Sequence, residues 1–514
     1  MTSLPVRLGG AALAGLLAAL SFEPYGWAYL LPFAVAGGTL SVIGVRPGRG
    51  FLGGLSFGVV FMLVLLPWLR VIGPDAWVAL SLLEALFYGL GGLATTVATR
   101  LPFWPLWVAA VWVGVEALRG SVPFGGFPWG RLAFATIDTP VADSMAYVGA
   151  SGTTFLVALV GTSVAWAVLR AGRDPARAGA AVVAACSVAI VPAAWPLHQP
   201  DPAGDYPRTN VAAVQGDVPG EGMNPFSERR AVLDNHVAAT LDLAKRVDAG
   251  QEGRPDLVIW PENSTDIDPF TDPSVYADIQ SAVDAVGVPV LVGAMVGGEE
   301  PEDVFNQGIV WEPGSGPGQT YSKRHPVPFG EYIPFRDQLA PYISRLDQIP
   351  RDMVAGTEPG VLTMNGITIG DVICFEVAYD EVVRDAAAET SMLVVQTNNA
   401  TYMGTGQVEQ QFAISRLRAI ETGLPVVVAA TNGVSAIVAP DGRVTAQADV
   451  RTRAVLTASV ISPVDDSWGL RLGPWIQLVL VAVSLVATAG GSVVTFRRRS
   501  RDGQRVERSR TEVS

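Results

Sequence analysis

Three residues whose types suit nucleophilic chemistry stand in the second half of the sequence. Glu262 follows the apolar run 257–261, Cys374 ends the run 369–373, and Lys323 lies in the stretch 321–334. A carboxylate can accept the proton of a thiol, and an ammonium group favours the thiolate and later a developing oxyanion. A carboxylate, an ammonium and a thiol that meet would therefore form a cysteine nucleophile with its base.

These residues need a sheet that brings distant segments together. Between about residues 208 and 462, short Val- and Ile-rich runs alternate with stretches of helical spacing. Runs that are apolar on both faces imply strands buried between helical layers, and the ends of such strands converge on one crevice. We expect strands at Val211–Gln215, Leu257–Trp260, Val288–Val292, Gly370–Phe375, Met392–Thr397 and Val426–Thr431, with helices at Arg229–Val247, Pro273–Val286 and Gln407–Glu421. The Gly- and Pro-rich stretch Glu312–Gln319 predicts a surface loop.

The rest of the chain is apolar enough to lie in a membrane. Of the 514 residues, 49% are hydrophobic and only 16% charged, and the apolar ones concentrate in residues 1–195 and 473–496. Crossing the hydrocarbon core takes about 20 apolar residues as a helix. Apolar segments lie at 8–22, 28–45, 51–69, 77–98, 103–118, 145–169, 178–195 and 473–496. We therefore expect a polytopic α-helical membrane bundle of about eight spans.

The first apolar segment is short and could be a signal peptide. It lacks a clear cleavage signal before Glu23, and another span follows within a few residues, so we expect an uncleaved helix. The predicted organisation is a seven-span bundle at 1–199, a catalytic domain at 208–463, a last span at 470–496 and a basic cytoplasmic tail at 497–514.

Arginines between the apolar segments predict the orientation. One set of connections carries Arg46, Arg49, Arg100, Arg170, Arg173, Arg177 and the cluster 497–510; the opposite set carries Arg70, Arg119 and Arg131. Because arginines favour the cytoplasmic side, both termini should be cytoplasmic. An odd number of spans before residue 200 then puts the middle domain outside the cytoplasm.

Charge and cysteine usage narrow the function classes. The net charge of −13, with basic residues clustered only in the tail, argues against a nucleic-acid partner. The chain has two cysteines, and Cys186 lies in an apolar run, so a disulfide with Cys374 is not expected. His198 and His236 have no partners at metal-ligand spacing, and we expect no metal and no cofactor. His325 could pair with a cysteine, but we expect a structural role for it, since Glu262 already supplies a base.

Three motifs resemble a known family. Trp260-Pro261-Glu262, the stretch from Lys323 to Pro334, and Ile373-Cys374-Phe375-Glu376 resemble the Glu-Lys-Cys motifs of the nitrilase superfamily. The whole chain is similar to its membrane-bound branch, the bacterial apolipoprotein N-acyltransferases, from the element 22–27 onward. The string Lys-x-His-x-Val-Pro-Phe-Gly-Glu-Tyr at 323–332 is the most specific match, because soluble nitrilases lack it in full.

The resemblance implies an αββα sandwich and a role for each matching residue. Glu262 would be the general base, Cys374 the acyl-accepting nucleophile and Lys323 the oxyanion stabiliser, helped by backbone N–H groups near residue 375. Glu331 and Glu376 match two further acidic positions near the thiol. Asn399 and Thr401 stand where many relatives carry Asp and Trp, which puts lipid preference in doubt more than the chemistry.

The resemblance also implies substrates and a location. The expected reaction is transfer of an acyl chain from a membrane phospholipid to the N-terminal amine of a diacylglyceryl-modified apolipoprotein, at the bacterial inner membrane, through a cysteine thioester. Two alternatives stay open. One is a membrane-tethered amidase with water as the second acceptor, and the other is a membrane scaffold that docks a polyprenol-phosphate mannosyltransferase, as some actinobacterial relatives do.

Overall fold

The chain folds into two compact units. The structure, a computed structural model, describes residues 3–195, 206–218, 229–298, 300, 303–339, 341, 343, 346, 349–462 and 467–511, with side chains as far as 497. Unit 1 comprises residues 1–196 and 471–514, and unit 2 comprises residues 197–470. The expected boundaries at 199 and 463, as well as His198, lie outside the described residues.

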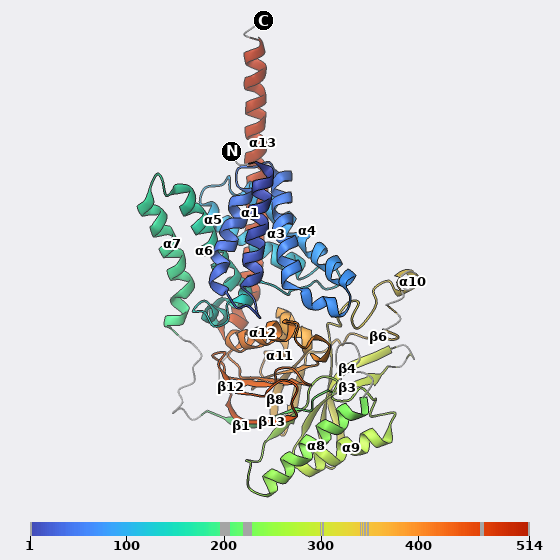
Figure 1. Ribbon diagram of the computed structural model, residues 1–514. Helices are drawn as coiled ribbons and strands as arrows, with labels where there is room; N and C mark the ends of the chain where they lie inside the picture. Colours follow the sequence, from blue (N-terminus) through green and yellow to red (C-terminus); the bar gives the residue numbers. More distant parts are fainter. Residues whose placement is uncertain are drawn as a thin grey trace. The chain divides into compact units, whose positions relative to one another are not determined.

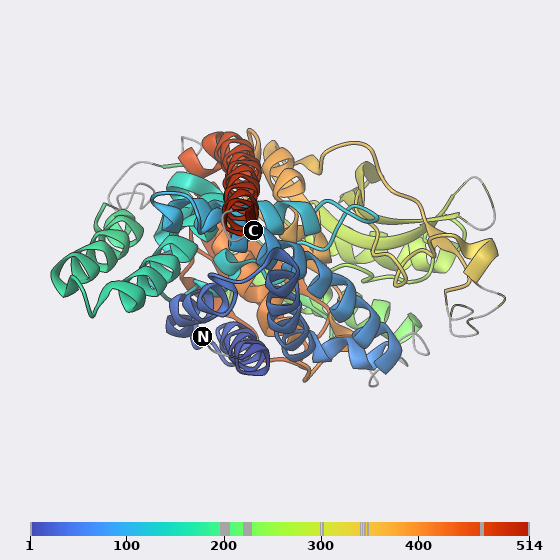
Figure 2. The same ribbon diagram turned by 90° about the horizontal axis from the view of Figure 1, so that it is seen from above.

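Unit 1 is helical, and a helix occupies each of the expected apolar segments. Figure 2 looks down these helices. Their bounds are α1 (Leu4–Leu20), α2 (Leu31–Val42), α3 (Pro47–Leu65), α4 (Pro74–Ala98), α5 (Trp104–Arg119), α6 (Met145–Arg170), α7 (Pro175–Ile190) and α13 (Trp468–Thr511). Among described residues, five helical segments, which contain α3, α4, α6, α7 and α13, are long and apolar enough to cross a membrane. Since α1, α2 and α5 are shorter, the count of eight crossings stays a prediction.

Helices α3 and α4 approach each other until their backbones touch. Gly50, Gly54 and Gly58 recur every four residues along one face of α3. A Cβ atom on Gly54 would stand 2.1 Å from the carbonyl oxygen of Tyr88, and one on Gly58 would stand 2.8 Å from Cα of Ala85. Small residues at this spacing are typical of close helix pairs in membranes, where packing drives association.

A buried cluster of four charged residues, here called the membrane-unit cluster, consists of Glu84, Glu116, Arg119 and Arg131. Arg119 lies 3.2 Å from Glu84, and Arg131 lies 3.6 Å from Glu116. We expected Arg119 and Arg131 in the connection after the fifth apolar segment; Arg119 is instead the last residue of α5, and both side chains are buried beside a carboxylate. Uncompensated charges are costly in the interior of a membrane bundle, so each arginine must be held by a carboxylate there.

The last helix is longer than expected. The apolar pattern ends near residue 496, where we expected the basic tail to begin, yet α13 continues to Thr511. Arg, Glu and Gln are good helix formers, so nothing in the tail's composition ends the helix at the last apolar residue.

Unit 2 contains two mixed β-sheets. The first has the order β13-β1-β2-β3-β4-β5, with β6 beside β4, and the second has the order β12-β11-β10-β9-β8-β7. Bounds of the first sheet are β1 (Arg208–Gln215), β2 (Leu257–Ile259), β3 (Val290–Gly297), β4 (Asp303–Glu312), β5 (Gly316–Ser322), β6 (Asp352–Met353) and β13 (Ala454–Ile461). Bounds of the second are β7 (Val361–Met364), β8 (Ile367–Ile373), β9 (Leu393–Thr397), β10 (Val426–Ala430), β11 (Ala436–Val438) and β12 (Val444–Gln447).

The two sheets face each other and form the inner layers of the expected αββα sandwich. Helices α8 (Arg229–Asp248) and α9 (Pro273–Val286) cover the outer face of the first sheet (Figure 1), with an apolar core between them. Helices α11 (Asp380–Ala387) and α12 (Gln407–Thr422) pack on the second sheet. A separate apolar core fills the space between the sheets. This sandwich confirms the fold class inferred from the sequence.

One local expectation is wrong. The predicted loop Glu312–Gln319 is a tight turn followed by the first part of β5, which pairs with β4. Gly314 and Gly316 both have positive φ, which the turn requires and glycine adopts readily. The glycines therefore mark the turn of a hairpin between β4 and β5. A short helix, α10 (Arg336–Leu339), follows later in the chain.

Candidate active site

Cys374 lies at the end of β8, where the strand changes into a short 3-10 helix (Cys374–Ala378). Its φ is +56°, a left-handed conformation that is uncommon for a residue with a side chain. Such conformations recur at functional sites, where the surrounding structure holds them. The side chain is half-buried, so the sharp change of direction presents the thiol at the strand end.

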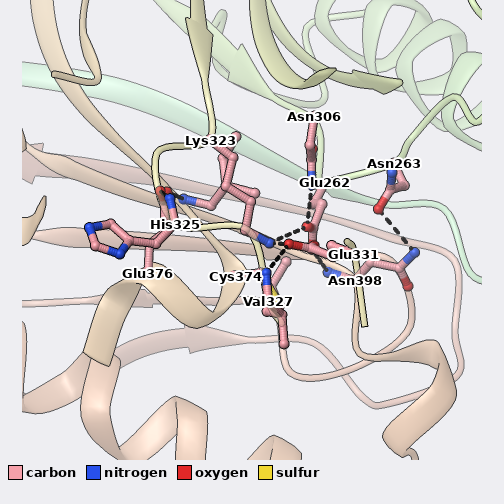
Figure 3. A network of polar contacts seen from close by, with 12 residues as sticks. Glu262, Asn263, Asn306, Lys323, His325, Val327, Glu331, Cys374, Glu376 and Asn398 are labelled. Atoms are coloured by element: carbon pink, nitrogen blue, oxygen red, sulfur yellow. Dashed lines mark hydrogen bonds and ion pairs between the residues drawn. The ribbon is translucent and has the colours of Figure 1, made fainter. Parts of the chain in front are cut away.

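Glu262 follows β2 and is held by three donors. Its Oε1 accepts from Nδ2 of Asn306 at 2.7 Å and from Nζ of Lys323 at 3.3 Å, and its Oε2 accepts from the backbone N–H of Asn398 at 2.7 Å (Figure 3). The side chain is 3% exposed. A carboxyl group that accepts three hydrogen bonds from three separate segments is fixed in position.

Lys323 comes directly after β5 and lies between two carboxylates. Its Nζ donates to Oε1 of Glu331 at 2.6 Å, in addition to Glu262. Glu331 is positioned by its own turn, because its Oε2 accepts from the N–H of Val327 at 2.7 Å while its N–H donates to the Val327 carbonyl. Figure 3 shows both carboxylates converging on the ammonium group, with Cys374 beside them. We call Glu262, Lys323, Glu331 and Cys374 the active-site cluster.

Glu376 is fully buried and accepts bonds from the segments that carry the cluster. Its Oε1 accepts from the N–H groups of Arg324 and His325 at 2.6 and 3.0 Å. Its Oε2 accepts from the N–H of Ile373 and the hydroxyl of Tyr321, each at 2.9 Å. Glu376 therefore ties the segment after β5, which contains Lys323, to the strand end that carries Cys374.

A layer of neutral polar side chains lies behind the thiol. The hydroxyl of Thr397 is 3.5 Å from Sγ of Cys374 and 3.1 Å from Oδ1 of Asn399. Nε2 of Gln411 donates to the Thr397 oxygen at 2.9 Å. Gln411 thus occupies one lone pair of the Thr397 oxygen. The hydroxyl proton of Thr397 can then be donated either to the sulfur or to Asn399.

The electrostatics of the cluster favour a neutral thiol and a charged lysine. Burial raises the pKa of the Cys374 thiol to about 12, Glu262 adds to the rise and Lys323 opposes it. Burial alone would lower the pKa of Lys323, but the carboxylates of Glu331 and Glu262 outweigh it and raise the pKa well above its usual range. Burial also raises the pKa of Glu331, although Lys323 opposes this. The site therefore holds a protonated thiol and a permanently charged ammonium group at neutral pH.

The structure brings Glu262, Lys323, Glu331 and Cys374 into one cluster and places Glu376 behind it as a link. Sequence reasoning missed Asn306 and Thr397, as well as the backbone N–H of Asn398. Asn306 lies in the alternating run Val304, Asn306, Gly308, Val310, and this period-2 pattern could have indicated a polar side chain turned inward.

The histidines are held by contacts unrelated to the cluster. The His325 ring stacks on Tyr379 with ring centroids 4.2 Å apart, and in Figure 3 it points away from Lys323. His236 is buried, with Nδ1 2.7 Å from the carbonyl of Val232 and Nε2 accepting from the N–H of Gly216. In the described part of the chain, no three His, Cys, Asp or Glu side chains are grouped to hold a metal ion.

Comparison with known proteins gives consistent matches along the chain. Residues 14–163 match the family described as apolipoprotein N-acyltransferase N-terminal domain, and residues 210–465 match the carbon–nitrogen hydrolase family. An apolipoprotein N-acyltransferase of Mycolicibacterium smegmatis is 38% identical, over 94% of this chain and 85% of that relative. One of Methylococcus capsulatus is 30% identical over 96% of this chain and 98% of the relative. Among solved structures, an amidase from Nesterenkonia sp. is 17% identical with a TM-score of 0.35, over 52% of this chain and 95% of the amidase.

Proposed function

Because the chain belongs to the apolipoprotein N-acyltransferase family, we propose that it moves a fatty acyl chain from a membrane phospholipid to the N-terminal amine of a diacylglyceryl-cysteine on an apolipoprotein. Family membership makes the chain a membrane protein and an enzyme of the carbon–nitrogen hydrolase superfamily. The donor, the acceptor and the thioester on Cys374 are the proposal. The relatives' names give no support for the expected mannosyltransferase partner, and the proposal does not include that partner.

The observation that carries the proposal is the meeting of a half-buried thiol with a buried carboxylate–ammonium–carboxylate group at the ends of β8, β2 and β5. A nucleophile, a base and a fixed positive charge are the parts that acyl transfer through a thioester needs. Glu262 is held by Asn306 and Asn398 rather than by Lys323 alone, so it can take up a proton without losing its position.

In the first half-reaction, Sγ of Cys374 attacks the carbonyl carbon of a phospholipid ester while its proton moves to Glu262. The carbonyl oxygen becomes an oxyanion, and the ammonium of Lys323 stabilises it. When the C–O bond breaks, Glu262 returns the proton to the leaving oxygen. A lysophospholipid departs, and the acyl chain remains on Cys374 as a thioester.

In the second half-reaction, the neutral α-amine of the lipoprotein's N-terminal cysteine attacks the thioester carbon. Glu262 accepts a proton from the attacking nitrogen, and the tetrahedral oxyanion again faces Lys323. The C–S bond breaks, the sulfur takes the proton back, and an amide is formed. Glu331 keeps Lys323 charged throughout, because its carboxylate raises the pKa of the ammonium group.

The membrane unit suits these substrates, since both are lipids that never leave the bilayer. We further propose that both termini are cytoplasmic and that unit 2 lies outside the cytoplasm, as the arginine distribution predicts. A membrane-impermeant maleimide applied to intact cells should label a cysteine placed at the exposed Asp248 of a Cys186→Ala chain. Labelling only after the cells are opened would overturn this orientation.

The test of the reaction is intact-mass analysis of the detergent-purified full chain with phospholipid. The wild type should gain the mass of one acyl chain, and hydroxylamine should remove it. Cys374→Ala should show no gain, whereas Cys186→Ala, the matched control at the other cysteine, should behave as the wild type does.

The second half-reaction needs the acceptor. A diacylglyceryl-cysteine peptide should remove the acyl chain from the enzyme and gain it as an amide. Loss of the adduct to water alone would favour an amidase. If the wild type formed no acyl adduct with any of several phospholipids, the thioester intermediate would be absent and the proposed reaction would be wrong.

A further inference from the structure

Asp371 is a fully buried carboxyl group that the proposed mechanism does not use. It lies on β8 between Ile369 and Ile373, which face the core between the two sheets, so by alternation its side chain also faces that core. The residue is 0% exposed, and neither carboxyl oxygen has a hydrogen-bond partner among the described residues. An ionised carboxylate without partners is among the most costly groups to bury.

A second oxygen without a donor shares the same space. Oε1 of Gln396, on the adjacent strand β9, also has no partner among the described residues. Oδ2 of Asp371 and Oε1 of Gln396 lie 2.1 and 2.7 Å from the point where a Cβ atom on Gly308 would stand. The missing side chain of Gly308 thus makes room for two oxygens that face each other from neighbouring strands. Two acceptors with no donor between them repel each other, whereas a proton on one of them turns the pair into a hydrogen bond.

The groups around Asp371 favour that proton. Burial raises the pKa of Asp371 well above its usual range, and the negative charges of Glu376 and Glu262 add to this. Tyr321 on β5 also faces it, with its own pKa raised by burial and by Glu376, so it is neutral. The N–H of Val372 opposes the shift but makes no hydrogen bond of standard geometry to the Asp371 carboxyl group.

The other end of Gln396 reaches the strand that carries the base. Its Nε2 donates to the carbonyl of Trp260 at 2.6 Å, two residues before Glu262. Asp371 in turn lies three residues before Cys374. A hydrogen bond from Asp371 to Gln396 would therefore complete a chain from the strand of Cys374, through β9, to the strand of Glu262.

We propose that Asp371 is a neutral carboxylic acid that donates a hydrogen bond to Oε1 of Gln396, and that this bond makes Asp371 a positioning residue for Glu262 and Cys374. The protonation is independent of the reaction that the enzyme catalyses. The positioning role rests on the proposed function.

The protonation is tested with Asp371→Asn in the detergent-purified full chain. An acid whose pKa is raised by folding stabilises the fold fully below its unfolded pKa of about 3.9 and loses that contribution as the pH rises through its folded pKa. An amide keeps the hydrogen bond and does not titrate. The Tm of Asp371→Asn should therefore exceed that of the wild type by an amount that grows as the pH rises above about 4. Asp248→Asn, at an exposed aspartate of the same unit, should show no such growth.

Two results would overturn the protonation. One is an Asp371→Asn chain that fails to fold or melts earlier than the wild type at every pH. The other is a wild-type Tm that depends on sodium or potassium relative to choline, with the dependence lost in Asp371→Asn, because a bound cation would then take the place of the proton. An infrared band of a protonated carboxyl group that disappears in Asp371→Asn would support the proposal directly.

The positioning role is tested by the rate of acyl-adduct formation on Cys374. Asp371→Asn should keep this rate within about threefold of the wild type, whereas Asp371→Leu, which has the same branched shape but no donor, should lower it at least tenfold without changing the KM for phospholipid. Equal rates in the two variants would remove the positioning role and leave the protonation standing. An inactive wild type would count against the proposed function alone.

Discussion

Two of the buried groups of charged side chains among the described residues are built differently. In the membrane-unit cluster, two arginines face two glutamates, so the charges are equal in number. Further bonds hold this cluster, such as those from Thr154 and the N–H of Leu132 to Glu116. In the active-site cluster, one lysine faces two carboxylates and a thiol.

The difference separates a structural cluster from a reactive one. Where every charge has an opposite partner, moving a proton would leave a buried charge uncompensated, so the arrangement resists chemistry. Where one cation is shared, burial raises the pKa of the thiol and of the Glu331 carboxyl, and the single charge of Lys323 opposes both shifts. Buried charge alone therefore does not indicate catalysis, but an unequal count beside a nucleophile does.

The largest expected effect comes from removing Glu262, the proposed base. Glu262→Gln should lower acyl transfer about 10³-fold, because general-base assistance typically contributes 10² to 10⁴. The same change removes a negative charge that raises the pKa of Cys374. Alkylation of Cys374 by iodoacetamide at neutral pH should therefore become faster while acyl transfer becomes slower, whereas the exposed Glu358→Gln should change neither rate. If both rates fell together, Glu262 would be acting only on the structure of the site.

Substitutions in the membrane-unit cluster should lower the stability of the protein rather than change its reaction. Arg119→Met leaves Glu84 buried without its partner, and breaking a buried pair in this way costs about 3–5 kcal/mol. Replacing both, as Glu84→Leu with Arg119→Met, should recover most of the loss, since an apolar pair often substitutes for a buried ion pair. Thermal unfolding in detergent measures both effects. A double variant as unstable as the single one would mean that the cluster contributes more than charge compensation.

The smallest expected effect tests how the thiol is oriented. Thr397→Val removes the hydroxyl that lies 3.5 Å from Sγ and helps to lower the pKa of Cys374. Iodoacetamide alkylation at neutral pH should slow by up to about tenfold, the equivalent of one ordinary hydrogen bond of about 1 kcal/mol. Thr397→Ser keeps the hydroxyl and should restore the rate. An unchanged rate in Thr397→Val would show that the proton of Thr397 serves Asn399 instead.

Much of this arrangement could be predicted, because it depends on local pattern. Apolar length located the helices of unit 1, and strand ends located Glu262 and Cys374, which follow one strand of each sheet. Contacts between distant segments could not be predicted in this way. The partners of Glu262 come from β4 and from the end of β9, and the burial of Arg119 depends on Glu84 one helix away. Nothing in the spacing of these residues along the chain indicates that they meet.

The contact between α3 and α4 has a consequence for how lipids move. A lipid tail can pass sideways into a helical bundle only where two neighbouring helices separate enough to admit it. The glycines of α3 bring its backbone against that of α4, and even one methyl group on Gly54 would collide there. These two helices therefore form a closed seam, and any lateral gate of unit 1 must open between other helices.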